Sequence, residues 1–430
     1  MIKKVLNNKL FQNIGVYTIS NIINAAIPFL LLPVLTRFLT PYDYGITATF
    51  QSLVGLLSFI VGLNTQMAII RRFYDDKINF PEYVSACIFI LLLSTFALSL
   101  IILPLSPYLS KLVEFPGPWF WTIIAVAFFQ YLFTVLLGIW QVRGKVYQYA
   151  IFQNAQTLLN ISASLCLIIV LKMNWQGRII AQTGSIAIFG IFAWVFLYKM
   201  GFMQKKIHKK NLKDALKFGL PLIPYSFTGW VLLSMDRIFI NNMLGLGATG
   251  LYSVAYQICM VITLFQLSFN NAWVPWHYER IRKNDEKTNV KIVKFSYAYV
   301  AFNFLLAILL ALLGPFFLKF FLGKDFFQAS SYLWWLSMAQ AANAIHIISI
   351  TYVNFHNKNI YLTYSSIFVT IIHIPITYFL IRWNGTMGAA QSLFISNLIA
   401  SILTFLIAAR FHKMPWFLKS QRARLSKLKG

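Results

Sequence analysis

Acidic residues are scarce in this chain: 11 of its 430 residues are Asp or Glu, against 37 that are Lys or Arg. Charged residues make up 11% of the sequence and hydrophobic residues 59%, a balance far from that of soluble globular domains. This composition excludes a water-soluble fold. The sequence also lacks the clustered histidines and carboxylates that an integral-membrane transferase would require.

Cysteine is equally rare. Cys87, Cys166 and Cys259 lie far apart inside apolar runs, which suits neither a disulfide framework nor a metal cluster, and favours a packing role. The phosphate-binding pattern G-x-x-x-x-G-K-[ST] and the nucleophile pattern G-x-S-x-G are both absent, so the chain itself is not expected to hydrolyse ATP or to act as a serine hydrolase. We expect no cofactor, no metal site and no enzymatic activity.

Long apolar stretches dominate what is present. A membrane-spanning helix needs about 20 apolar residues, and a chain in lipid must satisfy its own backbone hydrogen bonds, so these stretches predict helices. We place twelve spans, giving an all-α integral membrane protein. The predicted spans are 13–35, 44–64, 82–103, 118–140, 150–171, 178–198, 218–243, 248–271, 294–316, 328–352, 360–381 and 387–409.

Basic residues are distributed unevenly between the connections. Lys and Arg concentrate in the amino terminus, the even-numbered connections and the carboxyl tail, and short basic connections stay in the cytoplasm. Both termini are therefore predicted to be cytoplasmic, as an even number of spans requires. The net charge of +26 lies mainly beside spans, so topology and anionic lipid headgroups explain it without a nucleic-acid partner.

An internal repeat divides the chain into two halves. Superposing the halves places Leu39 on Leu244 and Gly45 on Gly250. Two halves with even numbers of spans predict two pseudo-symmetric six-helix bundles around a central cavity, as in transporters with parallel repeats. The predicted domains are an N-terminal bundle at 1–200, a basic cytoplasmic linker at 201–217, a C-terminal bundle at 218–410 and a basic cytoplasmic tail at 411–430.

Several short motifs carry a family resemblance. They are Leu39-Thr-Pro-Tyr-Asp-Tyr-Gly45, Arg143-Gly144, Asp236-Arg237 and Gly250-Leu-Tyr252-Ser. Together with the two-bundle pattern, they resemble the polysaccharide flippase branch of the multidrug/oligosaccharidyl-lipid/polysaccharide exporter superfamily. The resemblance is nearest to Wzx-type O-antigen or capsule repeat-unit flippases.

The resemblance implies a transporter of the bacterial inner membrane that moves undecaprenyl-diphosphate-linked oligosaccharide repeat units from the cytoplasmic to the outer leaflet by alternating access. Its partners would be the lipid-linked oligosaccharide, membrane lipids and other polysaccharide-assembly membrane proteins. Two alternatives remain open: a cation-coupled multidrug exporter of the same fold, and a membrane polymerase or transferase of lipid-linked glycans. The shortness of every predicted outer connection argues against the polymerase.

Arginines near the span ends are the candidates for binding a diphosphate, because a buried anion needs cationic, multiply hydrogen-bonding partners. Arg71, Arg72 and Arg143 also fit as topology charges at the inner surface. That interpretation is weaker for Arg37 and Arg237, which we place on the outer side.

Polar residues inside the spans complete the candidate site. Asn24, Gln51, Gln340 and Asn343 lie on polar stripes that either bind sugar hydroxyls or join helices. Asp236, an acid deep in the seventh span, and His346 are the candidates for ion coupling. Arg37 is the expected partner of Asp236.

Overall fold

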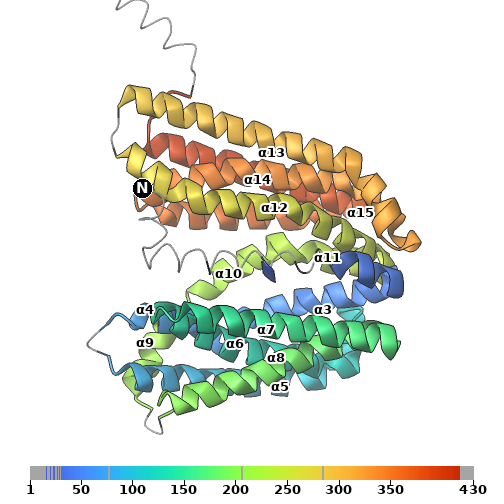
Figure 1. Cartoon of the computed structure of the whole chain (residues 1–430), viewed down its shortest axis with the longest axis vertical. Helices are drawn as coiled ribbons and strands as arrows, with labels where there is room; N and C mark the ends of the chain where they lie inside the picture. The colour runs from blue at the N-terminus through green and yellow to red at the C-terminus, as the bar shows by residue number, and fades with distance from the viewer. Residues whose placement is uncertain are drawn as a thin grey trace, which may run out of the picture. The chain divides into compact units, whose positions relative to one another are not determined.

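The computed structural model is all-helical throughout the residues that it describes, which are 16, 20, 23–24, 27, 29, 31–75, 78–204, 207–282 and 285–416. Most of the predicted first span and the tail after residue 416 lie outside that range. Figure 1 shows two compact units, which we describe separately. Unit 1 contains the chain up to Ser253 together with Leu322–Phe326, and unit 2 contains the rest.

The predicted all-α membrane fold is confirmed. Within the described residues, nine helices are long and apolar enough to cross a membrane. One of them, α15 (Asn359–Phe411), breaks at Asn384 and Gly385, between two predicted spans. The helix α14 (Leu333–Phe355) lies at the predicted tenth span but is not among the nine. The count of twelve stays a prediction.

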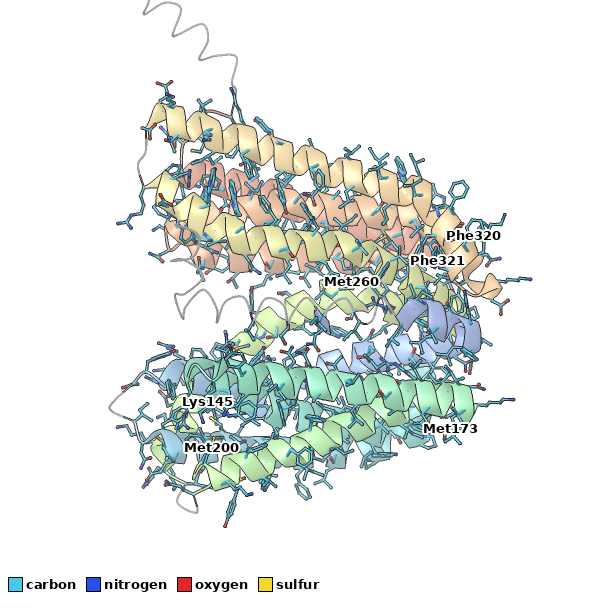
Figure 2. The ribbon with its side chains drawn as sticks, in the orientation of Figure 1. Lys145, Met173, Met200, Met260, Phe320 and Phe321 are labelled. Atoms are coloured by element: carbon cyan, nitrogen blue, oxygen red, sulfur yellow. The ribbon has the colours of Figure 1, made fainter. Side chains whose placement is uncertain are left out.

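Unit 1 is built mainly from the first half of the sequence. Its helices are α3 (Pro41–Ile60), α4 (Thr65–Arg72), α5 (Phe80–Val113), α6 (Phe120–Val142), α7 (Val146–Leu165), α8 (Asn174–Lys199), α9 (Lys209–Gly219), α10 (Leu222–Trp230) and α11 (Asp236–Leu244). Among the nine candidate spans, the one containing α6 is the most buried. Figure 2 shows Met173 at one end of this unit and Lys145 and Met200 at the other.

The helices α10 and α11 pack within unit 1. Trp230 donates its indole N–H to the Ser52 carbonyl at 2.8 Å, and Asn241 donates to Thr49 Oγ1 at 3.3 Å and to the Val113 carbonyl. The boundary between the two compact units therefore falls after Ser253. The sequence repeat instead places the boundary between the two halves near the linker at 201–217. The predicted domain assignment, which rests on the repeat, stays a prediction.

The start of α3 is set by local chemistry. The Thr40 side chain accepts a hydrogen bond from the Asp43 N–H at 3.2 Å, and Asp43 accepts one from the Thr40 N–H at 3.0 Å. This reciprocal capping box satisfies two of the helix's free N–H groups, and Pro41 at the first helical position loses no hydrogen bond there. The motif from Leu39 to Gly45 therefore forms the first turn of a helix, where the sequence analysis placed a loop up to residue 43.

Two repeat-related glycines meet at this end of unit 1. A Cβ atom on Gly45 would lie 1.9 Å from the Leu246 carbonyl oxygen, and a Cβ on Gly250 would lie 1.9 Å from that of Pro41. The first turns of α3 and α12 (Leu246–Ile281) thus touch backbone to backbone. The positions that the repeat superposes are glycine because each faces the other half's chain without room for a side chain.

Unit 2 contains most of α12, together with α13 (Glu286–Phe321), α14 and α15. Leu333 of α14 packs against Gly314 of α13, whose missing Cβ would lie 2.4 Å from it. An aromatic cluster of Phe269, Trp273 and Tyr299 joins α12 to α13, with the Phe269 and Tyr299 ring centroids 3.6 Å apart.

Substituting Gly250 with alanine is expected to lower the free energy of unfolding by about 1–3 kcal/mol, because overpacking forces backbone to move. Gly247→Ala is the matched control, since its Cβ would have nothing within 4 Å and alanine favours helix. The thermal unfolding midpoint of detergent-purified protein measures both. Equal midpoints for the two variants would contradict the close contact.

Candidate functional site

Arg178, in the second turn of α8, is held by neutral groups. Its Nη1 donates to Asn160 Oδ1 at 3.0 Å and to Ser164 Oγ at 2.5 Å. Asn160 and Ser164 lie four residues apart on α7, and Ser164 is fully buried. Across the described residues Arg178 forms no ion pair. A cation inside a membrane-spanning helix is thus positioned but not neutralised.

Tyr44 and Arg237 lie on neighbouring helices of unit 1. The buried Tyr44 comes from the first turn of α3, which packs against both α8, the helix of Arg178, and α11, the helix of Arg237. Arg237, in α11, donates through Nε to Ser253 Oγ at 3.2 Å and through Nη1 to the Leu233 carbonyl at 2.7 Å. The three side chains come from three different helices of unit 1. We refer to these two arginines and one tyrosine, carried by helices that adjoin α3, as the cationic cluster.

Asp236 occupies a distinct position beside this cluster. It follows the five-residue π-helical turn at Val231–Met235, a local widening that is frequent at functional sites. Its side chain is buried and accepts a hydrogen bond from the Tyr252 hydroxyl at 2.8 Å. The predicted partner, Arg37, is exposed and forms no ion pair within the described part of the chain, so that pairing is wrong for this structure. Tyr252, a neighbour on α12, takes its place.

Exposed or partly buried amides and hydroxyls form further hydrogen bonds between the helices of unit 1. Gln51 of α3 donates to Gln182, one turn after Arg178 on α8. Asn24 donates to Asn154 Oδ1 of α7 at 2.7 Å and accepts a hydrogen bond from Thr157. Asn24 and Gln51 were predicted to lie on polar stripes, and in this structure both join helices. Their use in sugar binding stays a prediction.

Three predicted arginines lie at helix ends at the other end of unit 1, Arg71 and Arg72 in the last turn of α4 and Arg143 directly after α6. Arg71 and Arg143 are exposed and stack on aromatic rings, Arg71 over Phe218 at 5.0 Å and Arg143 over Phe202 at 4.8 Å. Arg72 binds Asp214 of α9 through two nitrogens, at 3.0 and 2.6 Å, and Asp75 at 2.7 Å. The structure therefore separates these arginines from the cluster around Arg178.

The polar candidates of the second half lie in unit 2. Gln266 of α12 donates to Asn303 Oδ1 of α13 at 3.0 Å and to the Gln340 carbonyl of α14 at 2.8 Å, and it accepts a hydrogen bond from Asn343 at 3.2 Å. Gln340 Oε1 also accepts from Thr263 at 3.0 Å. His346 Nδ1 lies 2.9 Å from Thr404 Oγ1. These hydrogen bonds join the helices of this unit. The roles of Gln340 and Asn343 in substrate binding and of His346 in ion coupling stay predictions.

A histidine pair marks the end of α15. His412, one residue beyond the helix, lies with Nδ1 3.1 Å from Nε2 of His356. Burial, and to a smaller extent the charge on His356, lowers the pKa of His412. A hydrogen bond between two imidazole rings requires one of them to be neutral, so this contact depends on pH.

Sequence reasoning missed Arg178 because it stands at the predicted boundary of a span, where an arginine is normally a topology charge. The signal that could have found it is the polar spacing on the preceding span, where Asn160 and Ser164 lie on one face. As for metals, no group of three His, Cys, Asp or Glu side chains in the described ranges could hold an ion.

Comparisons with known proteins give consistent relatives. Residues 10–280 match a family described as "Polysaccharide biosynthesis protein". A protein of the Lsg locus of Haemophilus influenzae is 24% identical, over 85% of this chain and 90% of its own length. A probable low-salt glycan biosynthesis flippase of Haloferax volcanii is 21% identical over 90% of this chain and 80% of its own. A capsular polysaccharide biosynthesis protein of Staphylococcus aureus is 21% identical over 91% and 97%.

Solved structures match the fold over nearly the whole chain. A multidrug resistance MATE family transporter of the MOP superfamily in its inward-facing conformation superposes with a TM-score of 0.71 at 17% identity, covering 96% of this chain and 95% of that one. An outward-facing transporter described in the same words gives 0.61 at 19% identity, covering 99% and 98%. At these identities the likeness establishes a MATE-type transporter fold.

Arg72→Gln is expected to lower the free energy of unfolding by about 1 kcal/mol, because it breaks an ion pair that is only partly exposed. The side chains of Arg72 and Asp214 are 28% and 31% exposed. Arg71→Gln, which removes a stacking contact but no ion pair, is the control. Chemical or thermal denaturation in detergent measures both, and a larger loss for Arg71→Gln would contradict the assignment.

Acidification is expected to destabilise the His356–His412 contact. Because the folded state lowers the pKa of His412, the unfolded chain binds a proton more readily, and stability falls as pH drops through the unfolded value of about 6.5. Between about pH 7.5 and 5.5, the unfolding midpoint should therefore fall less in His412→Asn than in wild type. An equal fall in both proteins would show that His412 does not contribute.

Proposed function

Because the chain belongs to the polysaccharide biosynthesis protein family, we propose that it is a flippase for lipid-linked oligosaccharides, acting on undecaprenyl-diphosphate-linked O-antigen or capsule repeat units. The family and the solved structures with this fold are transporters and flippases rather than enzymes. This function requires transport from the cytoplasmic leaflet to the outer leaflet of the bacterial inner membrane.

The observation that carries the proposal is the imbalance of charge inside unit 1. Arg178 and Arg237 lie on two helices that both pack against α3, and within the described residues Arg178 has neutral partners only. A cationic cluster in a membrane interior favours an anionic ligand, because charge in a low-dielectric region must be compensated. A lipid diphosphate has that charge, and a cationic drug does not.

Exposed and partly buried amides of unit 1 suit the sugar part of the substrate. Gln51 and Gln182, and also Asn24 and Asn154, are amides that can exchange their mutual hydrogen bonds for sugar hydroxyls. Gln340 and Asn343 are proposed to do the same from unit 2. The polyprenyl tail would remain in the surrounding lipid, because its transfer out of hydrocarbon is unfavourable.

Alternating access of two bundles would move the headgroup, with both termini in the cytoplasm. Two negative charges that move outward across an inside-negative membrane gain about 4.6 kcal/mol per 100 mV. The potential can therefore assist flipping without a coupled ion. If transport is coupled to the exchange of an ion, Asp236 and His346 are the residues proposed to bind that ion.

A multidrug exporter is the second candidate, favoured by the structures that share the fold. That function calls for acidic residues in the transport path. In the described part of unit 1, the buried acids near the cationic cluster are Asp43, whose carboxylate caps α3, and Asp236, hydrogen-bonded to Tyr252. Drug resistance conferred on a sensitive host would support this second function.

The decisive experiment uses a cell that lacks this chain. Wild type is expected to restore surface glycan and to clear lipid-linked repeat units from the cytoplasmic leaflet. Arg237→Ala, Arg37→Ala and Asp236→Ala are expected to restore less, with Arg237→Ala the most affected. Arg382→Ala, which removes an exposed arginine of α15, is the control and should restore fully. Normal glycan display without the chain would refute the flippase.

A further inference from the structure

One membrane-spanning segment of unit 1 is broken part-way along its length. The helix α3 ends at Ile60, and α4 begins at Thr65. Three consecutive residues between them have left-handed backbone, with φ angles of 73° at Gly62, 52° at Leu63 and 56° at Asn64. Leucine in this conformation is strained, because its Cβ approaches the following carbonyl oxygen. Strain of this kind is concentrated at ligand-binding sites, so the neighbourhood of the break is a candidate site.

A polar pocket with a volume of about 200 Å³ adjoins the break. It is lined by residues of α3, α4 and α6, which are Ser58, Gln66, Ala127, Gln130, Tyr131 and Thr134. Each of them except Ala127 has a hydroxyl or an amide in its side chain. Ala127 and Tyr131 are buried, whereas the other four are partly exposed, so the pocket has a closed floor and an opening. Within the described residues, no charged side chain lines it.

The pocket opens at membrane depth. Ser58 and Gln130 lie well inside two segments that are long and apolar enough to cross a membrane, Pro41–Arg72 and Gly117–Val142. Hydroxyls and amides are costly to place against hydrocarbon, and irregular backbone at this depth is tolerated only where it is buried in protein or lines a water-filled cavity. The opening is therefore expected to face a water-filled space, which is what the path of a polar substrate requires.

The break forms one wall of the pocket. Gly62 packs so closely on the Tyr131 ring that a Cβ atom would overlap it, and the Gly62 N–H donates to Ser94 Oγ of α5 at 2.9 Å. The Tyr131 hydroxyl shares a hydrogen bond with Thr65 Oγ1 at 2.6 Å. These contacts hold the Tyr131 ring in place. They also let the end of α3 and the start of α4 line the same pocket.

Gln66 has an acceptor that no side chain of the protein uses. Its Nε2 donates to Asn64 Oδ1 at 3.4 Å, and Asn64 Nδ2 donates to Ser226 Oγ of α10 at 3.0 Å. These two hydrogen bonds orient the Gln66 amide. Gln66 Oε1 is buried and, among the described residues, accepts no hydrogen bond. A buried acceptor without a donor is unfavourable, and a hydroxyl group of a ligand would satisfy it.

Neutral hydrogen-bonding groups around a small space suit a sugar ring. Pockets for drug-sized ligands have volumes of about 300–1,000 Å³, so this smaller pocket fits a smaller group. Sugar hydroxyls donate and accept hydrogen bonds, as do the side chains of Gln66, Gln130 and Thr134. Tyr131 adds an aromatic surface for the apolar face of a sugar. The lack of charge in the described lining disfavours a phosphate or a metal cation, because a buried charge needs compensation.

We propose that this pocket binds one uncharged sugar ring of the transported oligosaccharide, and that Gln66, Gln130 and Thr134 determine which hydroxyl pattern it accepts. The assignment rests on the proposed function, because it names the part of the substrate that the pocket recognises. None of these three residues was among the substrate-binding residues predicted from the sequence.

Binding is tested by saturation-transfer NMR on the full-length protein in detergent micelles. The probes are the methyl glycosides of glucose, galactose, mannose, rhamnose and N-acetylglucosamine, and at least one is expected to bind wild type. Gln66→Leu and Gln130→Leu should each weaken the binding of that glycoside about fivefold, the usual effect of losing a neutral hydrogen bond. Gln141→Leu, which replaces an exposed glutamine near the end of α6, is the matched control and should bind as wild type does.

Two milder variants keep the test valid where the leucine variants fail to fold. Thr134→Val and Ser58→Ala each remove one hydroxyl with little change in volume, and they should change the order of affinity among the glycosides. No binding of any glycoside to wild type, wild-type affinity in folded Gln66→Leu and Gln130→Leu proteins, or an equal loss in Gln141→Leu would overturn the site. Loss of glycoside binding in sodium chloride but not in choline chloride would assign the pocket to a cation instead.

Complementation separates this inference from the proposed function. Failure of wild type to restore surface glycan would refute the flippase itself. Restoration by wild type and equally by the Gln66→Leu/Gln130→Leu double variant would refute only the sugar site. The expected result is restoration by wild type and Gln141→Leu, with reduced restoration by the double variant at equal protein level in the membrane.

Discussion

Hydrocarbon offers no hydrogen-bond partner, and this constraint organises the interior of the protein. Every polar side chain within a membrane-spanning helix needs a partner from its own helix or a neighbour. Gln266 meets this requirement with Asn303 and Gln340, and Asn24 meets it with Asn154. Arg178 meets it only in part, because its neutral acceptors take two bonds and leave its charge uncompensated. The cation is therefore where a ligand has the most to contribute.

Close backbone contact places the other members of the cluster. Gly45 and Gly250 allow α3 and α12 to touch at their first turns, which fixes the position of Tyr44, the residue before Gly45. The π-helical turn before Asp236 changes the phase of the following helix and so sets where Arg237 lies. The π-helical turn at Val231–Met235 thus gives Asp236 and Arg237 directions that a regular α-helix would not give them.

Charge, rather than fold, distinguishes the proposed substrate from the alternatives. Transporters titled as multidrug resistance proteins share this architecture, and one fold supports many functions. What differs is the chemistry inside the bundle: arginines held by amides and hydroxyls suit an anionic headgroup. The relatives named for glycan or capsule biosynthesis agree with this reasoning, which starts from the residues.

The helical membrane fold could be predicted from the sequence alone, because lipid restricts apolar stretches to helices and because hydropathy is a local property. The predicted spans from residue 44 onward overlap helices of the structure, although α5 and α12 each run ten residues past the predicted end. The break at Asn384 and Gly385 falls between two predicted spans. The repeat also predicted which glycines correspond, although not that they touch.

Only the tertiary structure determines which residues distant in sequence contact each other. Arg72 pairs with Asp214, whereas the sequence suggested that Arg72 binds substrate. Asp236 accepts a hydrogen bond from Tyr252, whereas the sequence suggested Arg37 as its partner. Arg178 acquires its significance from Asn160 and Ser164, which α7 brings beside α8. A span's composition determines that it enters the membrane, but its rotation and its neighbours determine which polar groups meet, and those depend on the packing of all the helices at once.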